Sequence, residues 1–260
     1  VGVAIFDQLP VHRVEGDNHP AGAIGIADPV KQTTPAALKA LADAGIHVIM
    51  LTGDNRVTAE AIARRLGIDV IEHTHNQGYG ANQKTCYDAM LARGVDVVAM
   101  LHPDDQYPGA LLPRLIVPIV DGAYDLMLGS RFCGLDPRDG GMPEYKFVMN
   151  RLLTWSQNRV MGTRLSEFHT GYRVFSSAAL TQIPYHLNRN DFVFDAEMLA
   201  QAICLGHRIG EVPSPARYFA GASSIGFRES VKYGLGVVSV TARAWASRRG
   251  ALEDTRFSAR

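Results

Sequence analysis

Residues 102–106 concentrate side chains that could hold a metal ion. Asp104, Asp105 and Gln106 are three neighbouring oxygen-bearing residues with His102 close by, and they directly follow an apolar run at 95–101. Hard divalent cations such as Mg²⁺ and Mn²⁺ bind carboxylate and carbonyl oxygens and bridge readily to diphosphates. Aspartate and proline are also common turn residues, so the segment by itself leaves a plain turn equally open.

Three arginines and two acids are further chemical candidates. The planar guanidinium groups of Arg131, Arg173 and Arg217 suit bidentate binding of phosphate, although a single arginine is more often part of a surface salt bridge. Asp195 and Glu197 lie two residues apart on an expected helix, so they point to different faces and at most one faces a site. That one could be a general base for a hydroxyl acceptor. The alternative is a solvated helix start, where acids are favoured.

The elements that must position these residues alternate between strand and helix. Apolar runs predict strands, glycines and prolines mark helix ends, and Val1–Phe6 is a further possible strand. Strands are expected at 22–28, 47–54, 69–73 and 95–103, with helices at 35–44, 56–67 and 81–94 between them. Continuous apolar strands that alternate with helices are typical of a parallel α/β sheet covered on both faces.

The second half of the chain alternates less regularly. A loop rich in glycine and proline is expected at 133–144. Helices are expected at 110–122, 145–162, 194–206 and 228–249, and strands at 124–132, 168–177 and 207–218.

Several motifs of this chain occur in one order. Residues 76–107 combine an Asn-x-Gly-x-Gly turn, a helix, a buried strand and an acidic motif followed by Gln, and matching segments follow at 129–132, 166–177 and 192–225. This succession, over about 70–249, resembles family 2 glycosyltransferases, above all the polyprenyl-phosphate mannosyl- and glucosyltransferases. The resemblance implies the GT-A fold, a Rossmann-like α/β fold whose mostly parallel sheet is flanked by helices, with its site at the carboxyl ends of the strands.

The same resemblance implies a reaction and its site residues. A sugar would move from a nucleotide-sugar donor to a lipid phosphate, such as polyprenyl phosphate, or to a hydroxyl, with inversion at the anomeric carbon. A divalent metal (Mn or Mg) and arginines would neutralise the leaving diphosphate. The implied substrate-binding residues are Asn76, Gly78, Gly80, Arg131, Arg173 and Arg217, and the implied catalytic residues are Asp195, Glu197, Arg131 and Arg173.

The implied metal ligands depart from the family pattern at one position. Asp104 takes the place of the second acid of the family's Asp-x-Asp motif, and Gln106 follows as expected. His102 stands where the family has the first acid. Histidine can ligate Mn²⁺ but is a poorer ligand for Mg²⁺, so this departure puts the metal dependence in question.

A second resemblance covers the N-terminal segment. Residues 22–69 resemble the phosphorylation domain of heavy-metal P-type ATPases, whose TGDN motif stands here at 52–55. The 260 residues contain neither the DKTGT motif that carries the phosphorylated aspartate nor the GDGxND motif, so ion pumping is excluded. Asp54 could imitate a nucleotide-contacting acid of the glycosyltransferases, or it could belong to an inherited turn without a role.

The sequence therefore predicts a chimera joined near residues 69–71. The expected domains are an ATPase-like βαβα segment at 1–69 that completes or abuts the sheet, a glycosyltransferase domain at 70–249 and a tail at 250–260. Two alternatives stay open: a non-catalytic fusion product without a competent nucleotide site, and a fragment similar to P-type ATPases and haloacid dehalogenases.

Composition bears on partners and location. The chain is 47% hydrophobic and 20% charged, and residues 1–130 carry a net charge of −6 against +6 for 131–260. Three cysteines without a CxxC pair fit a reducing compartment, and no signal peptide is expected, so the chain is predicted to be cytoplasmic. No nucleic-acid partner is expected. Amphipathic helices with basic and tryptophan residues at 145–162 and 228–249 make peripheral membrane contact a possibility beside simple core packing.

Overall fold

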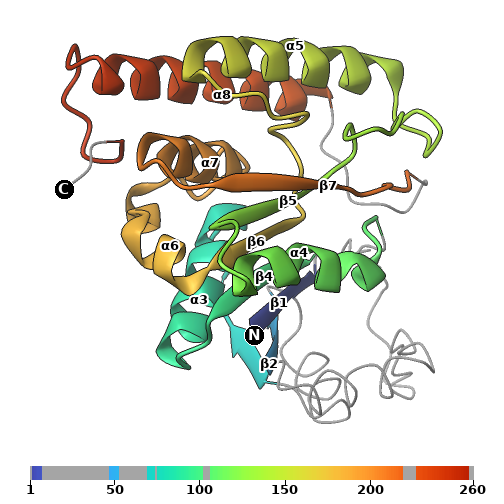
Figure 1. Cartoon of the computed structure of the whole chain (residues 1–260), viewed down its shortest axis with the longest axis vertical. Coiled ribbons are helices and arrows are strands. Elements are labelled where there is room, and N and C mark those ends of the chain that lie inside the picture. The colour runs from blue at the N-terminus through green and yellow to red at the C-terminus, as the bar shows by residue number, and fades with distance from the viewer. Residues whose placement is uncertain are drawn as a thin grey trace, which may run out of the picture.

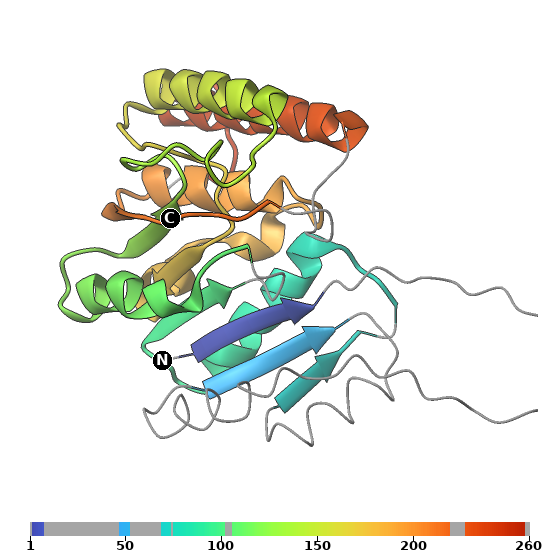
Figure 2. The same cartoon turned by 90° about the vertical axis from the view of Figure 1, so that its right-hand side faces the viewer.

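The computed structural model describes residues 2–7, 47–52, 69–73, 75–101, 106–218 and 227–257. Within these residues the chain forms one seven-stranded sheet flanked by helices (Figures 1 and 2). The strands are β1 (Gly2–Asp7), β2 (His47–Thr52), β3 (Asp69–Glu72), β4 (Val97–Leu101), β5 (Leu126–Ser130), β6 (Arg173–Ser176) and β7 (Ile209–Pro213). The predicted α/β fold with a mostly parallel sheet is confirmed.

The strand order is β3-β2-β1-β4-β6-β5-β7. Strands β3, β2, β1 and β4 are mutually parallel, β6 is antiparallel to both of its neighbours, and β5 and β7 are parallel. The first strand of the chain thus lies in the middle of the sheet, between β2 and β4, as Figure 2 shows. Strands from both sides of the expected junction form one sheet, while the strand expected at 22–28 lies outside the described residues.

Helices cover the sheet and form a further layer beyond it. They are α3 (Tyr79–Ala92), α4 (Leu112–Val120), α5 (Glu144–Met161), α6 (Ser177–Gln182), α7 (Phe194–Cys204) and α8 (Phe227–Arg248), with single 3₁₀ turns at Gly109–Leu111 and Tyr185–Leu187. Figures 1 and 2 both show α5 and α8 side by side, with α7 between them and the sheet.

Strand β4 is buried on both faces, which explains its continuous apolar run. Along β4, Val98 and Met100 pack into a cluster with α3 and α7, whereas Val97 and Ala99 pack into a second cluster with α4. Alternate residues of a strand point to opposite faces, so a strand buried on both faces must be apolar throughout.

A third apolar cluster joins the outer helices to α7. It contains Leu153 and Met161 of α5, Ala196 and Ala200 of α7, Val237 and Val240 of α8, and Phe257. The segment after α8, expected to be a tail, therefore contributes a buried side chain to the core. Within the described residues, no helix is long and apolar enough to cross a membrane.

Candidate functional site

The predicted metal segment follows the end of β4. This strand ends at Leu101, as the sequence predicts. His102 and Asp104 lie outside the described residues, as does Asp54. Gln106 is buried, and its backbone carbonyl accepts a hydrogen bond from the N–H of Arg217 at 3.1 Å. Among the residues whose structure is described, no group of three His, Cys, Asp or Glu side chains is close enough to hold a metal ion.

The Asn-x-Gly-x-Gly turn forms the start of α3. The Asn76 side-chain oxygen accepts a hydrogen bond from the N–H of Gly78 at 2.9 Å. Gly78 precedes the first helical residue with a φ of 96°, a backbone conformation that favours glycine. The N–H of Gly80 donates to the carbonyl of Asn190 at 2.8 Å. The turn therefore docks this helix onto the backbone of residues 188–192.

We expect Gly80→Ala to destabilise the protein, because a Cβ atom at Gly80 would lie 2.4 Å from the Arg189 carbonyl oxygen and 2.9 Å from the Phe194 Cβ. Both neighbours would have to move, which should lower the free energy of unfolding by about 1–3 kcal/mol in urea titrations. Gly234→Ala is the matched control: that position lies within α8, and a Cβ there meets nothing closer than 3.9 Å. Equal stability of the two variants would contradict the prediction.

Asp195 and Glu197 have separate surroundings, as their spacing predicts. Asp195 is half-buried in the first turn of α7 and accepts hydrogen bonds from the Tyr79 hydroxyl at 2.8 Å and the Gln83 amide at 3.0 Å. Burial, with the Asp195 carboxylate beside it, raises the pKa of the Tyr79 hydroxyl, which therefore stays a hydrogen-bond donor. Glu197 is fully buried and accepts from the Arg189 N–H and from Arg256, each at 2.7 Å. Of the two carboxylates, only that of Asp195 is partly accessible.

Arg131 is part of a buried ion pair with Glu167. Its guanidinium binds the Glu167 carboxylate through Nε at 2.9 Å and also through Nη2, and it donates to the Tyr218 hydroxyl at 2.6 Å and the His169 carbonyl at 2.9 Å. Asn150 donates a further hydrogen bond to Glu167 at 2.8 Å. Burial by itself would raise the pKa of Glu167, but the adjacent Arg131 and these hydrogen bonds hold it below its ordinary value.

Arg173 is also buried, and its guanidinium binds only backbone. It donates to the carbonyl oxygens of Thr170 at 2.8 Å, Asp195 at 2.6 Å and Phe168 at 2.9 Å. The structure thus brings Arg173 close to Asp195. Arg173 and Arg131 together hold residues 167–170 in place through hydrogen bonds. Arg217, in contrast, is exposed. Among the three predicted phosphate-binding arginines, the accessible guanidinium is that of Arg217.

Sequence reasoning missed Glu167 and His169. Burial lowers the pKa of His169 to about 3, so its imidazole is neutral near pH 7. Its Nδ1 lies 2.8 Å from the Tyr233 hydroxyl, and its Nε2 is buried without a hydrogen-bond partner. The signal for Glu167 was present, since an acid between two motif arginines is a natural partner for one of them.

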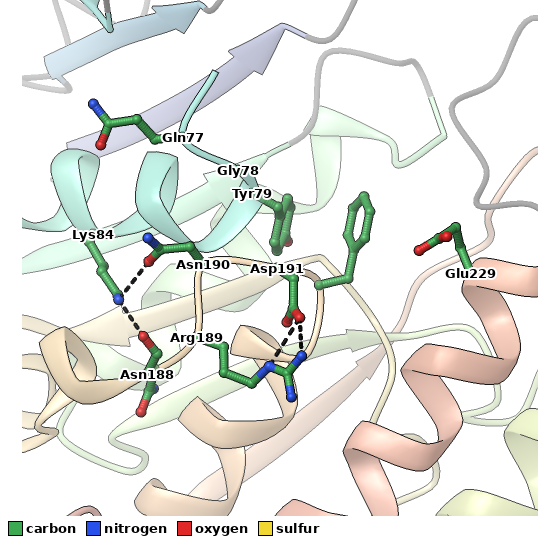
Figure 3. A pocket seen from close by; sticks show the side chains of 10 residues that line it. Gln77, Gly78, Tyr79, Lys84, Asn188, Arg189, Asn190, Asp191 and Glu229 are labelled. Carbon is green, nitrogen blue, oxygen red and sulfur yellow. Dashed lines mark hydrogen bonds and ion pairs between the residues drawn. The ribbon is translucent and has the colours of Figure 1, made fainter. Parts of the chain in front are cut away.

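A pocket of about 740 Å³ lies where the start of α3 meets the loop 188–192 (Figure 3). Lys84 binds the Asn190 side-chain oxygen at 2.8 Å, and the Tyr79 and Phe192 rings are tilted by 31° with centroids 5.0 Å apart. Figure 3 places Glu229, at the start of α8, on the far side of the loop. Gly78 is the predicted site residue that lines this pocket, and Tyr79 connects the pocket to Asp195.

The fold matches solved glycosyltransferase structures. Glucosyl-3-phosphoglycerate synthase from Mycobacterium tuberculosis, solved with Mn²⁺, UDP and phosphoglyceric acid, aligns with a TM-score of 0.61 and 13% identity over 98% of this chain and 79% of that chain. Its complex with Mg²⁺ and UDP aligns with a TM-score of 0.61 at 15% identity. The sheet order and these neighbours define the fold: the chain has the GT-A fold of these glycosyltransferases.

A curated relative gives the family. The dolichyl-phosphate hexose transferase of Haloferax volcanii is 31% identical over 221 residues, which are 85% of this chain and 87% of the relative. The chain belongs to the family of this transferase. The match is longer than residues 70–260, so it includes part of the N-terminal segment.

The second resemblance is confirmed as well. The silver-exporting P-type ATPase of Salmonella typhimurium is 66% identical over 59 residues, and a copper-transporting ATPase of Rhizobium meliloti is 58% identical over 55 residues. The chain spans only 7% of the length of each. A family model described as haloacid dehalogenase-like hydrolase matches residues 4–110. The chain therefore combines similarity to P-type ATPases with similarity to a hexose transferase, as expected of a chimera.

Proposed function

We propose that this protein transfers a hexose from a nucleotide-sugar donor to a lipid phosphate or a hydroxyl, with inversion at the anomeric carbon. The observation that carries the proposal is the 31% identity over 87% of a dolichyl-phosphate hexose transferase. The neighbours with UDP bound support a nucleotide at the carboxyl edge of the sheet.

A divalent cation fits this proposal through the chemistry of its donor set. Asp104, Gln106 and His102 would hold it, since two oxygen donors and an imidazole suit Mn²⁺ better than Mg²⁺. When bound, the cation would supply positive charge for the leaving diphosphate. The exposed Arg217 would add charge, while Arg131 and Arg173 would act mainly by holding residues 167–170 in place.

The nature of the acceptor decides the role of Asp195. A hydroxyl acceptor needs a general base, and the half-buried Asp195 beside the pocket is the better placed carboxylate because Glu197 is fully buried and ion-paired. A phosphate acceptor is already anionic and needs no base. Asp195 would then act by orienting Tyr79 and the start of α3.

Calorimetric titration tests this function directly. The protein would be titrated with UDP-, GDP- and dTDP-sugars, with and without Mn²⁺. Saturable, Mn²⁺-dependent binding of one donor supports the transferase. If none of the nucleotide sugars gives a binding heat, a fusion product without a competent nucleotide site is favoured.

The outer faces of α5 and α8 support a peripheral contact with membranes. Exposed apolar side chains on these helices are Val148, Met149, Leu152, Trp155, Val231, Leu235, Val238 and Trp245. Exposed Arg151, Arg159, Arg243 and Arg248 lie on the same two helices, and exposed Arg249 directly follows α8. Two other apolar residues of α5, Leu153 and Met161, instead pack into the core. An anionic lipid surface suits apolar side chains next to basic ones, with about 1 kcal/mol for each nearby Lys or Arg.

We expect the protein to sediment with anionic vesicles and much less with neutral ones. The double variant Leu152→Ser/Trp155→Ser should reduce sedimentation at least about tenfold, since it removes two apolar side chains that are 55% and 65% exposed. Val117→Ser, which changes an exposed residue of α4, is the control and should bind as the unchanged protein does. Equal sedimentation with both vesicle types would leave a water-soluble acceptor as the better proposal.

A further inference from the structure

The segment after α8 is tied to α7 by a chain of ion pairs. Asp254 is buried and binds Arg243 at 2.9 Å and Arg256 at 2.8 Å. These arginines, above all Arg256, hold the pKa of Asp254 far below its ordinary value, so it stays ionised. Arg256 in turn binds the buried Glu197 at 2.7 Å. Next to it, Phe257 is buried among the side chains of the outer helices and α7. The segment is thus anchored by charge and by an apolar residue.

Glu197 links Arg256 to the loop that lines the pocket. One of its oxygens binds Arg256, and the other accepts the backbone N–H of Arg189 at 2.7 Å. Arg189 lies in the loop 188–192 that lines the pocket. The neighbouring Asn188 is fixed separately by a reciprocal amide pair with Gln201, at 2.8 and 2.7 Å. The Arg189 backbone therefore depends on Glu197 for its hydrogen bond.

A buried carboxylate needs a partner to stay in place. Removing one member of a buried ion pair leaves an uncompensated charge, and the remaining group then protonates or moves toward water. Burial already raises the pKa of Glu197, while the Arg189 N–H and Arg256 oppose that rise. Without Arg256, Glu197 would become a weaker acceptor for Arg189.

We infer that Arg256 is a positioning residue, which acts through Glu197 to fix the Arg189 backbone and with it the shape of the pocket loop 188–192. The inference stands independently of the reaction proposed above, because it concerns the loop and not the substrate. It assigns Glu197 to the support of the pocket. The segment after α8, which contains Arg256, therefore supports the pocket.

Hydrogen–deuterium exchange of the full chain tests this inference. In Arg256→Met, exchange of peptides covering 186–194 should rise at least about tenfold, the size expected when a hydrogen bond to a charged group is lost. Peptides covering 95–101, in the middle of the sheet, should change far less. Arg256→Lys keeps the charge and should restore part of the protection. Arg208→Met, which removes an exposed ion pair with Asp125, should leave both regions unchanged.

A double-mutant cycle separates positioning from general stability. If Arg256 acts through Glu197, then Arg256→Met/Glu197→Gln should exchange at 186–194 no faster than Glu197→Gln alone. Additive effects of the two changes would overturn the inference. So would an equal rise in exchange at 186–194 and 95–101, because that result would show only a loss of global stability.

Discussion

Glu167→Ala is expected to lower the free energy of unfolding by about 3–5 kcal/mol, the usual result of removing one partner of a buried ion pair. Glu167 is fully buried and accepts hydrogen bonds from Arg131 and Asn150. Its loss leaves the guanidinium of Arg131 without a counter-charge in the interior. Equilibrium unfolding in urea, followed by circular dichroism, measures the change.

A matched control uses an exposed ion pair. Asp136→Ala removes the partner of Arg138 at the surface, where water screens both charges, so the urea midpoint should stay unchanged. Two variants with similar midpoints would contradict the structural role of Glu167.

The pH dependence of stability provides a second test of the same pair. The pKa of Glu167 in the folded protein lies below its value of 4.5 in an unfolded chain. Its stabilising contribution is therefore complete above that pH and is lost as the pH falls through the folded-state pKa. Glu167→Gln should flatten this acid-side loss. An unchanged pH profile in that variant would assign the loss to other carboxylates.

Asp104→Ala is expected to weaken the Mn²⁺-dependent binding of a nucleoside diphosphate at least about 100-fold. The reason is that a direct carboxylate ligand contributes more to metal affinity than the surrounding groups, whose loss already costs about 10–100-fold. Calorimetry with UDP or GDP, with and without Mn²⁺, gives the ratio. Asp121→Ala, an exposed acid directly after α4, is the control and should bind normally.

The same titration tests the departure at position 102. With His102 as a ligand, Mn²⁺ should support tighter nucleotide binding than Mg²⁺ does. His102→Asp should reduce or reverse that preference, because it restores an all-oxygen ligand set. Unchanged nucleotide binding in Asp104→Ala would remove the metal role from this segment.

Much of the sheet could be predicted because its strands coincide with short apolar runs. The segments at 47–54, 69–73 and 95–103 each have an apolar centre, at 48–51, 70–71 and 97–101, and each contains an observed strand. Strand β6 does not follow this pattern. Its first residue, Arg173, is charged yet buried, and only its three backbone carbonyl partners make that burial possible.

The candidate site was less predictable than the fold. Residue type suggests that a motif arginine binds phosphate. It does not show whether the guanidinium already binds a carbonyl or a carboxylate of the same chain. Arg131 and Arg173 both meet such internal partners. On α5, Leu152 and Leu153 are equally apolar and adjacent, and only packing decides that one is exposed and the other buried.

The central position of β1 has a consequence for the whole molecule. This strand supplies hydrogen-bond partners to β2 on one side and to β4 on the other. A shortened chain without residues 2–7 would present two unpaired strand edges instead of none at that point in the sheet. Open edges of this kind invite pairing with other chains and aggregation. The six residues of β1 therefore keep the facing edges of β2 and β4 paired within one sheet.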